Sequence, residues 1–292
     1  MKLIWRKFSF DFSKRTYIMG ILNVTPDSFS DAGLFFDKSA AIKQALHMVD
    51  DGADIIDIGG ESTRPGSEPV SLEEELKRTI PVIEAIAKEI PIPISIDTYK
   101  AAVAKRALDA GASMVNDISG LRFDPEMLKV VSEYKVPVVI MHIKGKPKDM
   151  QINPVYEALI PEMLDYLRGS IRLALEAGIP DNAIIIDPGI GFGKAFEQNL
   201  AIIHNLQNFM LLEKPVLIGV SRKAFIGKIL GDAPPGQRLE GTAAAGAISI
   251  LNGANIIRVH DVREMGKVAK VADAIKREKI IWDNAGTARK FL

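Results

Sequence analysis

Polar and charged residues follow short apolar runs at eight places along the 292-residue chain. Their carboxylates, amides, imidazoles, hydroxyls and cations can bind a ligand or exchange protons with it. The groups are Asn23, Asp57, Asp97, Asn116 with Asp117, His142, Asp187, Ser221 with Arg222 and Lys223, and Arg258 with His260. Any one Asp or Asn after a strand can simply cap the next helix. Eight such ends together favour a polar pocket of mixed charge that binds a small ligand.

Two loops rich in Gly, Pro, Ser and Thr indicate an anion site. The first covers residues 23–31 and the second covers residues 59–66. Loops of this kind supply backbone N–H groups and hydroxyls to an anion, and Arg64 adds a guanidinium. A solvated turn explains the Gly and Pro but not an arginine between Thr63 and Pro65.

Several known catalytic motifs do not match. The run Gly189-Ile-Gly-Phe-Gly-Lys194 is neither the dinucleotide fingerprint nor a Walker loop, and the run from Gly219 to Lys223 lacks the second glycine of a nucleophile elbow. The chain has no cysteine, and no histidine pair has the spacing of a helical zinc site. A hard cation shared with ligand phosphates stays open, because magnesium often has few protein ligands.

The elements that must position these residues alternate between strand and helix. The pattern predicts a (β/α)8 TIM barrel, in which the carboxyl ends of all strands meet on one functional face. An open doubly wound sheet has the same alternation, but eight consecutive units favour the closed barrel. The expected strands are 18–24, 54–58, 92–97, 113–117, 137–142, 183–187, 215–220 and 255–260. The expected helices are 40–50, 72–89, 101–110, 125–134, 156–177, 198–211, 242–251 and 264–277.

Local signals support these boundaries. Ser71 and Glu74 have the spacing of a helix capping box, and glycines follow four of the expected helices at 52, 111, 178 and 253, where a left-handed C-cap is expected. His47 and His204 fall inside expected helices, so we interpret them as ordinary packing or surface histidines.

The first 16 residues stand outside the alternation. Apolar side chains recur there at every second position or nearly so, which predicts a β-hairpin that closes the bottom of the barrel: Leu3, Trp5, Phe8, Phe10 and Phe12. No linker or break in composition divides the rest, so we expect a single domain over 1–292. The tail 281–292 has no role that the sequence assigns.

Composition limits the partners. Lys plus Arg (37) equal Asp plus Glu (37), and this zero net charge argues against a nucleic-acid binder. No apolar stretch of about 18 residues is present, and the amino terminus has no signal-peptide core. We therefore expect a cytoplasmic protein with small-molecule substrates, no nucleic acid and no membrane.

Two long motifs resemble the signatures of the dihydropteroate synthase family. They are Met19-Gly-Ile-Leu-Asn23-Val-Thr-Pro-Asp27-Ser-Phe29-Ser-Asp31 and Asp57-Ile-Gly-Gly-Glu-Ser-Thr63-Arg64-Pro65-Gly66. Shorter matches follow in family order up to about Asp261, at residues 95–98, 116–117, 141–142, 187–194, 221–223 and 258–260. The stretch 142–147 departs from the family by carrying Lys144 and Lys146 where arginine is common.

The resemblance implies a reaction. The family is a (β/α)8 barrel that joins 7,8-dihydropterin-6-ylmethyl pyrophosphate to 4-aminobenzoate, and it releases pyrophosphate and 7,8-dihydropteroate for folate synthesis. The implied route is dissociative (SN1-like), Mg²⁺ is the implied cofactor, and sulfonamides imitate the aminobenzoate. Family members are commonly homodimers.

The resemblance also implies a role for each matching residue. Those implied for catalysis are Asp27, Arg64, Asp97 and Lys223. Those implied for the pterin are Asp97, Asn116, Met141, Asp187, Phe192, Gly219, Lys223 and Arg258. Those implied for the pyrophosphate are Asn23, Thr63, Arg64, Arg258 and His260, with Mg²⁺ on Asn23. Those implied for the aminobenzoate are Phe29, Thr63, Pro65, Ser221 and Lys223.

Two alternatives stay open at this point. One is a methyltetrahydrofolate–corrinoid methyltransferase, which has no need of a pyrophosphate loop, and the other is a catalytically silent pterin-binding protein. The almost uncharged helix 243–250 fits a dimer face and burial in the barrel wall equally well.

Overall fold

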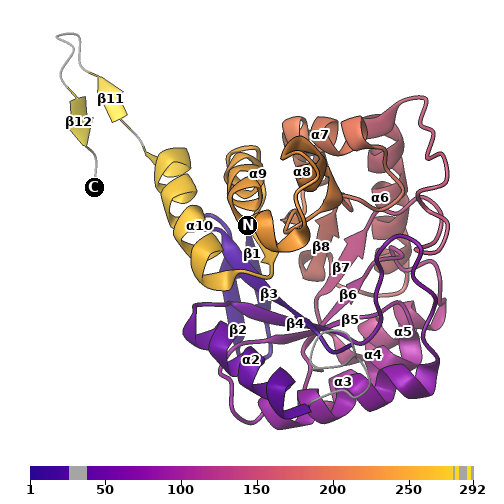
Figure 1. The fold of residues 1–292 in the computed structure, drawn as a ribbon. Coiled ribbons are helices and arrows are strands. Elements are labelled where there is room, and N and C mark those ends of the chain that lie inside the picture. The colour runs from indigo at the N-terminus through magenta and orange to yellow at the C-terminus, as the bar shows by residue number, and fades with distance from the viewer. Residues whose placement is uncertain (26–37, 279, 283–287, 291–292) are drawn as a thin grey trace.

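The computed structural model describes residues 1–25, 38–278, 280–282 and 288–290 (Figure 1). Eight parallel strands form a barrel in the order β8-β7-β6-β5-β4-β3-β10-β9, and a bridge between Ile186 and Val216 joins the last strand to the first. The predicted TIM barrel is therefore confirmed. The strands are β3 (Tyr17–Asn23), β4 (Ile55–Gly59), β5 (Ile94–Asp97), β6 (Met114–Asp117), β7 (Val138–Met141), β8 (Ile184–Asp187), β9 (Leu217–Ile218) and β10 (Ile256–Val259).

Burial on both faces explains why these strands are almost continuously apolar. Parallel strands in such a barrel are covered by helices outside and by layered side chains inside. Every residue of β4, β6, β7 and β8 is buried, and the polar residues among them stand at or near the carboxyl ends. The alternation thus places the polar groups on one rim.

Helices surround the strands on the outside (Figure 1). They are α2 (Lys38–Asp50), α3 (Leu72–Ile86), α4 (Ala101–Ala110), α5 (Glu126–Tyr134), α6 (Leu159–Glu176), α7 (Phe196–His204), α8 (Ala224–Ile229), α9 (Leu239–Leu251) and α10 (Val262–Arg277). The Ser71 side chain accepts the Glu74 N–H at the start of α3. Positive φ angles occur at all four glycines expected after helices, Gly52, Gly111, Gly178 and Gly253.

The structure corrects two helix predictions. The segment expected as one helix over 198–211 is α7 followed by a 3-10 helix, Leu206–Leu212, with the break at Asn205. The six-residue helix α8 was not expected. Six residues make fewer than two turns, which is too short for an apolar period to stand out.

The amino-terminal hairpin closes the bottom of the barrel, as predicted. Strands β1 (Lys2–Trp5) and β2 (Phe8–Asp11) pair antiparallel, with Leu3 opposite Phe10. Leu3, Trp5 and Phe10 pack with the inward-facing residues at the amino ends of the barrel strands, such as Met19 and Ile55. The Trp5 indole N–H also donates to the Ser113 carbonyl at 2.8 Å.

The tail contains a second small hairpin, in which β11 (Ile280–Trp282) pairs with β12 (Ala288–Lys290). Within the described residues, no helix is both long and apolar enough to cross a membrane.

Candidate functional site

An arginine at the end of β10 connects carboxylates from two other strands. The Arg258 Nε donates to Asp57 Oδ2 at 2.6 Å, and its Nη2 donates to Asp97 Oδ2 at 2.6 Å. The Asn116 amide Nδ2 donates to the same Asp57 oxygen at 2.9 Å. Residues from β4, β5, β6 and β10 thus form one hydrogen-bonded network at the carboxyl rim.

Burial sets the electrostatics of this network. The Asp57 side chain is fully buried, and those of Asp97 and Arg258 are mostly buried. Removal from water raises the pKa of Asp97 above its ordinary value, and the Arg258 guanidinium opposes that rise. The Asp57 and Asp97 charges raise the pKa of Arg258 and hold it ionised. Both ion pairs therefore fix the guanidinium plane at the rim.

A second group of charges lies at the ends of β8 and β9. Asp187 Oδ1 accepts the Gly189 N–H at 2.7 Å, and burial raises the Asp187 pKa while the Lys223 charge lowers it. The Lys223 ammonium stands 4.4 Å from the centre of the Phe192 ring. Burial lowers the pKa of Lys223 to about 8, although Asp187 and Asp97 oppose this fall. The two groups of charges therefore act on each other across one site.

Apolar side chains border these charges. Met141 is buried in a cluster with Ile143 and Met150, and Phe192 packs against this cluster. At Gly219, an added Cβ would lie 4.0 Å from the Arg258 Cβ, so the glycine leaves space beside the arginine. The predicted pterin residues thus combine polar groups with apolar walls.

A serine and a histidine meet at the edge of the network. The Ser221 Oγ lies 2.9 Å from His260 Nδ1, and the His260 backbone N–H donates to the same Oγ. Burial and the Arg258 charge lower the pKa of His260 to about 3. His260 is therefore an uncharged hydrogen-bonding group at neutral pH.

The two loops predicted to bind an anion are placed only in part. The Asn23 and Asp97 side-chain oxygens both approach Gly59, where an added Cβ would lie 3.8 Å from Asn23 Oδ1 and 3.7 Å from Asp97 Oδ2. Arg64 and Pro65 are exposed on the loop after β4, and the Thr63 side chain is half-buried. Asp27 and Phe29 lie outside the described residues.

Some strand-end residues have roles that differ from ligand binding. Asp117 accepts the N–H groups of Ser119 and Leu121, so it caps a turn. Asp57 is one of the polar strand-end residues picked out in the sequence, but no binding role was assigned to it. In the structure it connects Asn116 to Arg258.

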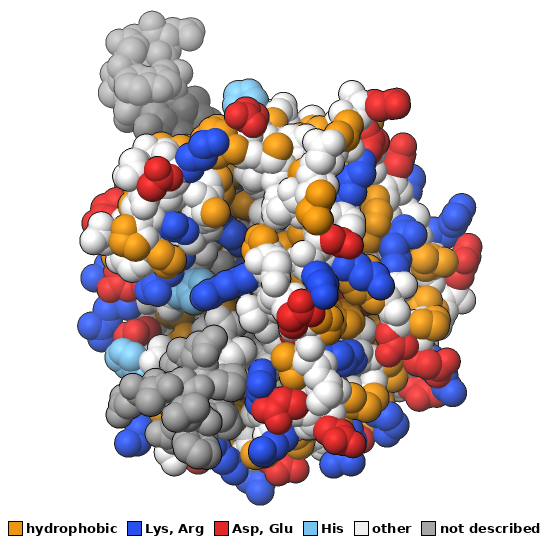
Figure 2. Space-filling model, turned by 45° about the vertical axis from the view of Figure 1, so that its right-hand side comes forward, with side chains coloured by type: hydrophobic (Ala, Val, Ile, Leu, Met, Phe, Trp, Pro, Cys, Tyr) orange, Lys and Arg blue, Asp and Glu red, His pale blue; other side chains and the backbone are white. Residues whose placement is uncertain are grey.

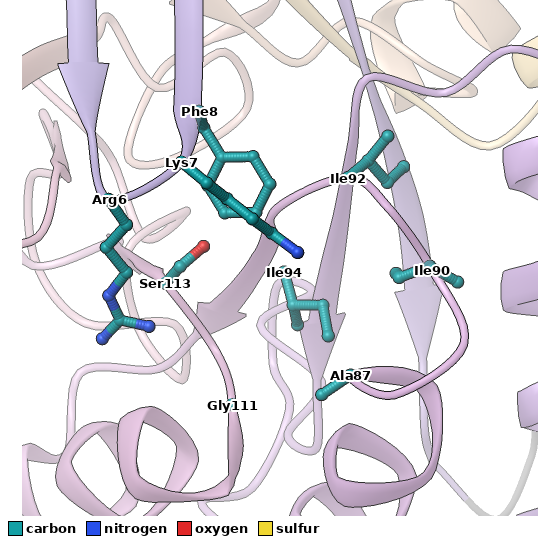
Figure 3. Close-up of a pocket in the computed structure, with 9 residues that line it drawn as sticks. All are labelled: Arg6, Lys7, Phe8, Ala87, Ile90, Ile92, Ile94, Gly111 and Ser113. Carbon is teal, nitrogen blue, oxygen red and sulfur yellow. The ribbon is translucent and has the colours of Figure 1, made fainter.

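Two cavities lie away from the centre of this network. One of about 280 Å³ lies at the amino ends of the strands, between the hairpin residues Arg6, Lys7 and Phe8 and the isoleucines of the β5 region (Figure 3). It is lined by none of the predicted site residues. The other, of about 220 Å³, is lined by His260 and Asp261 together with His47 and other residues of α2. Acidic and basic side chains are interspersed on the face drawn in Figure 2.

Comparisons with known proteins point to one family. The family model of pterin binding enzymes matches residues 19–260. The chain is 54% identical over 268 residues to the dihydropteroate synthase of Synechocystis sp., covering 92% of this chain and 93% of the relative. It is 50% identical over 264 residues to that of Bacillus subtilis, covering 90% of each.

Solved structures give the same result. A Yersinia pestis dihydropteroate synthase with a sulfonamide drug complex has a TM-score of 0.89 at 42% identity, covering 94% of this chain and 99% of that chain. A Xanthomonas albilineans dihydropteroate synthase with 4-aminobenzoic acid has a TM-score of 0.89 at 41% identity, covering 95% and 99%.

Proposed function

The chain belongs to the dihydropteroate synthase family of pterin-binding enzymes, transferases of folate synthesis, and we propose how its residues carry out that reaction. One observation carries the proposal. Asp97, Asn116, Asp187 and Arg258 lie on four strands and Lys223 follows a fifth, and hydrogen bonds and electrostatic interactions link them at one rim. This constellation offers acceptors, donors and a cation to a flat heterocycle.

Three polar side chains form hydrogen bonds with the pterin in this proposal. The Asp187 carboxylate has about four acceptor positions and gives one to Gly189, so it can accept the paired N–H groups of the pterin amidine edge. Asp57 takes one N–H of Asn116, which orients the amide so that its carbonyl oxygen faces the ligand. Lys223 donates to the pterin carbonyl. Arg258 lies over the ring plane, where a guanidinium stacks well.

The chemical step breaks the bond between the pterin methylene and the diphosphate oxygen. The electron pair leaves with the diphosphate, and a cation conjugated to the pterin remains. Arg64, Arg258 and Thr63 stabilise the departing charge, and His260 contributes an uncharged hydrogen bond. The carboxylates of Asp97 and Asp27 stabilise the cation.

The aminobenzoate then attacks the methylene. Its amine is neutral at pH 7, so the C–N bond forms without a strong general base, and the surplus proton leaves afterwards. Phe29, Pro65, Ser221 and Lys223 line its site. The proposed order is that the pterin substrate binds first and that the aminobenzoate site is complete only afterwards.

The residues present fit a magnesium ion shared with the diphosphate. The described residues contain no group of three His, Asp or Glu that could hold a metal by themselves. Asn23 Oδ1 supplies one hard oxygen next to Asp97, and magnesium commonly takes its other ligands from phosphates and water. When bound, the ion neutralises part of the diphosphate charge.

Release of pyrophosphate tests this function. The purified chain is given the dihydropterin pyrophosphate and 4-aminobenzoate, with magnesium or with a chelator, and pyrophosphate is measured by a coupled assay. We expect release that requires both substrates and magnesium. Methyl transfer to a corrinoid without pyrophosphate release, or pterin binding without turnover, would instead support the two alternatives.

We also propose that this cytoplasmic enzyme is a homodimer. Exposed aliphatic side chains are present both on α9 and on the 3-10 helix before β9, with Leu211 72% and Ile248 49% exposed. An added Cβ at Gly253 would lie 3.2 Å from the Met210 sulfur, so the 3-10 helix approaches the residues that follow α9. Apolar patches of this kind commonly mark protein interfaces.

Sedimentation at micromolar concentration tests the dimer. Leu211→Asp should convert it to a monomer, whereas Ile152→Asp at an equally exposed position (78%) away from this surface should not. A wild-type chain that sediments as a monomer would contradict the proposal.

A further inference from the structure

Lys194 is a buried lysine that forms no ion pair with any described residue. The residue is 2% exposed, and the Asp187 carboxylate acts on its amine only from beyond ion-pair distance. Lysines are rarely buried without such a partner, because removing an ammonium from water is costly. Burial accordingly lowers the Lys194 pKa well below its ordinary value. The residue therefore needs an explanation other than an ion pair.

The Lys194 amine contacts two different loops. Its Nζ donates to the Phe192 carbonyl at 2.8 Å on the loop after β8, and to the His142 carbonyl at 3.2 Å after β7. It also lies 3.0 Å from His142 Nδ1. The nitrogen can satisfy all three contacts in either protonation state: an ammonium donates to both carbonyls and to Nδ1, and a neutral amine donates to the carbonyls and accepts an imidazole N–H. The amine thus crosslinks the two loops.

Backbone contacts between the same loops leave little room for adjustment. Gly189 and Gly193 both have positive φ, and an added Cβ at either would lie 2.1 Å from a carbonyl oxygen of the loop after β7. The Tyr156 hydroxyl donates to the Gly193 carbonyl at 2.7 Å from the outside. The loop after β8 is therefore fixed both by the loop after β7 and by Tyr156.

This crosslinked loop carries two of the proposed pterin groups. Phe192 presents its ring to the Lys223 ammonium, and the Gly189 N–H donates to Asp187. The His142 backbone N–H also donates to the Asp187 carbonyl at 2.9 Å. A displacement of this loop would move the apolar wall and the carboxylate together.

We propose that Lys194 is a positioning residue that sets Phe192 and Asp187 against Lys223 in the pterin site. The proposal rests on the proposed function, because it names a residue that prepares that site. Lys194 itself does not touch the ligand.

The test compares Lys194→Met with a matched control, Lys214→Met. Lys214 is also buried (7% exposed), but it pairs with Asp181 at the opposite end of the barrel. We expect Lys194→Met to melt cooperatively, to exchange the amide hydrogens of residues 188–194 faster, and to bind the pterin substrate about tenfold more weakly by calorimetry. Lys214→Met should keep the pterin Kd within about twofold of wild type.

The dissociation constant separates positioning from simple structural support. A structural role alone would reduce the fraction of active molecules and lower kcat, but it would not change the pterin Kd or KM of the folded ones. Folded Lys194→Met with a pterin Kd within about twofold of wild type would overturn the proposal.

If Lys194→Met does not fold, the Tyr156→Phe variant tests the proposal in its place. It removes only the hydroxyl bond to Gly193, and we expect the pterin Kd to rise about threefold. An unchanged Kd would overturn the proposal. A wild-type chain that neither binds pterin nor releases pyrophosphate would instead refute the proposed function.

Discussion

Replacing Lys223 with methionine should stabilise the protein and weaken pterin binding. Lys223 is half-buried beside Phe192, and burial lowers its pKa from 10.5 to about 8. The folded state therefore holds this proton less well than the unfolded chain does. Methionine retains an unbranched apolar side chain over the ring but has no charge to desolvate.

The size of the stabilisation follows from the two pKa values. Each pH unit between them corresponds to ~1.4 kcal/mol, so ~3.5 kcal/mol is an upper limit. Partial exposure of the side chain screens its charge and reduces the expected gain to about 1–2 kcal/mol.

The effect of pH has a defined sign. Below pH 8, Lys223 is protonated in both the folded and the unfolded wild type. The folded state then has the full free-energy cost of burying the ammonium. Between pH 8 and 10.5 the unfolded chain binds more protons, so wild-type stability rises with pH. The advantage of Lys223→Met should therefore shrink over this window and be absent above it.

Binding should change in the opposite direction. Loss of a charged donor to the pterin carbonyl costs ~1.5–3 kcal/mol, which weakens affinity by about 10- to 150-fold. Wild-type affinity should also fall as pH rises through 8, because the ammonium loses its proton.

Urea unfolding from pH 7 to 10 and pterin calorimetry check both effects. Lys228→Met is the control, because its ammonium stands 4.5 Å from the Phe196 ring in the same manner but is exposed on α8. It should change stability and affinity little. A Lys223→Met protein that is less stable than wild type at pH 7 and binds pterin equally well would refute the reasoning.

Three further predictions concern the rest of the site. Arg64→Ala should lower kcat by about 10²-fold with little change in the pterin Kd, because the arginine acts on the departing diphosphate. Stopped-flow turnover and calorimetry measure the two effects. A weaker pterin Kd with an unchanged kcat would exclude Arg64 from that role. Asp57→Ala should lower the free energy of unfolding by ~3 kcal/mol and weaken pterin binding. The reason is that the donors of Asn116 and Arg258 lose their shared acceptor. A urea unfolding curve that matches wild type would contradict this prediction. Calorimetry should find weak 4-aminobenzoate binding without pterin or pyrophosphate, and tight binding would contradict the proposed order.

The barrel could be predicted because its signals are local and repeated. Eight apolar runs separated by helical periods indicate the same architecture at every unit, and glycines after four of the helices support the boundaries. The helix over 198–211 was predicted as continuous because its apolar spacing continues past Asn205, where the structure changes to a 3-10 helix. Helix α8 was missed because six residues give no measurable period.

The sequence could select candidate site residues but not the contacts between them. Strand ends and the shorter motif matches selected Asp97, Asn116, Asp187 and Lys223, which the structure places at one rim. Contacts between residues that are far apart in the sequence could not be predicted. An example is the contact of Arg258 with Asp57, which are 201 residues apart. Lys194 belongs to one of the motif matches, but its burial could not be predicted, because a lysine in a glycine-rich run normally indicates a surface loop.

The central claim is that the rim groups Asp187, Asn116 and Lys223 bind a pterin ring. A crystal structure of this chain with 7,8-dihydropteroate tests it most directly. We predict the pterin within about 3 Å of polar atoms of all three side chains, beneath the Arg258 guanidinium. Density for the ligand at the opposite end of the barrel, in the cavity under the hairpin turn, with the rim unoccupied, would contradict it.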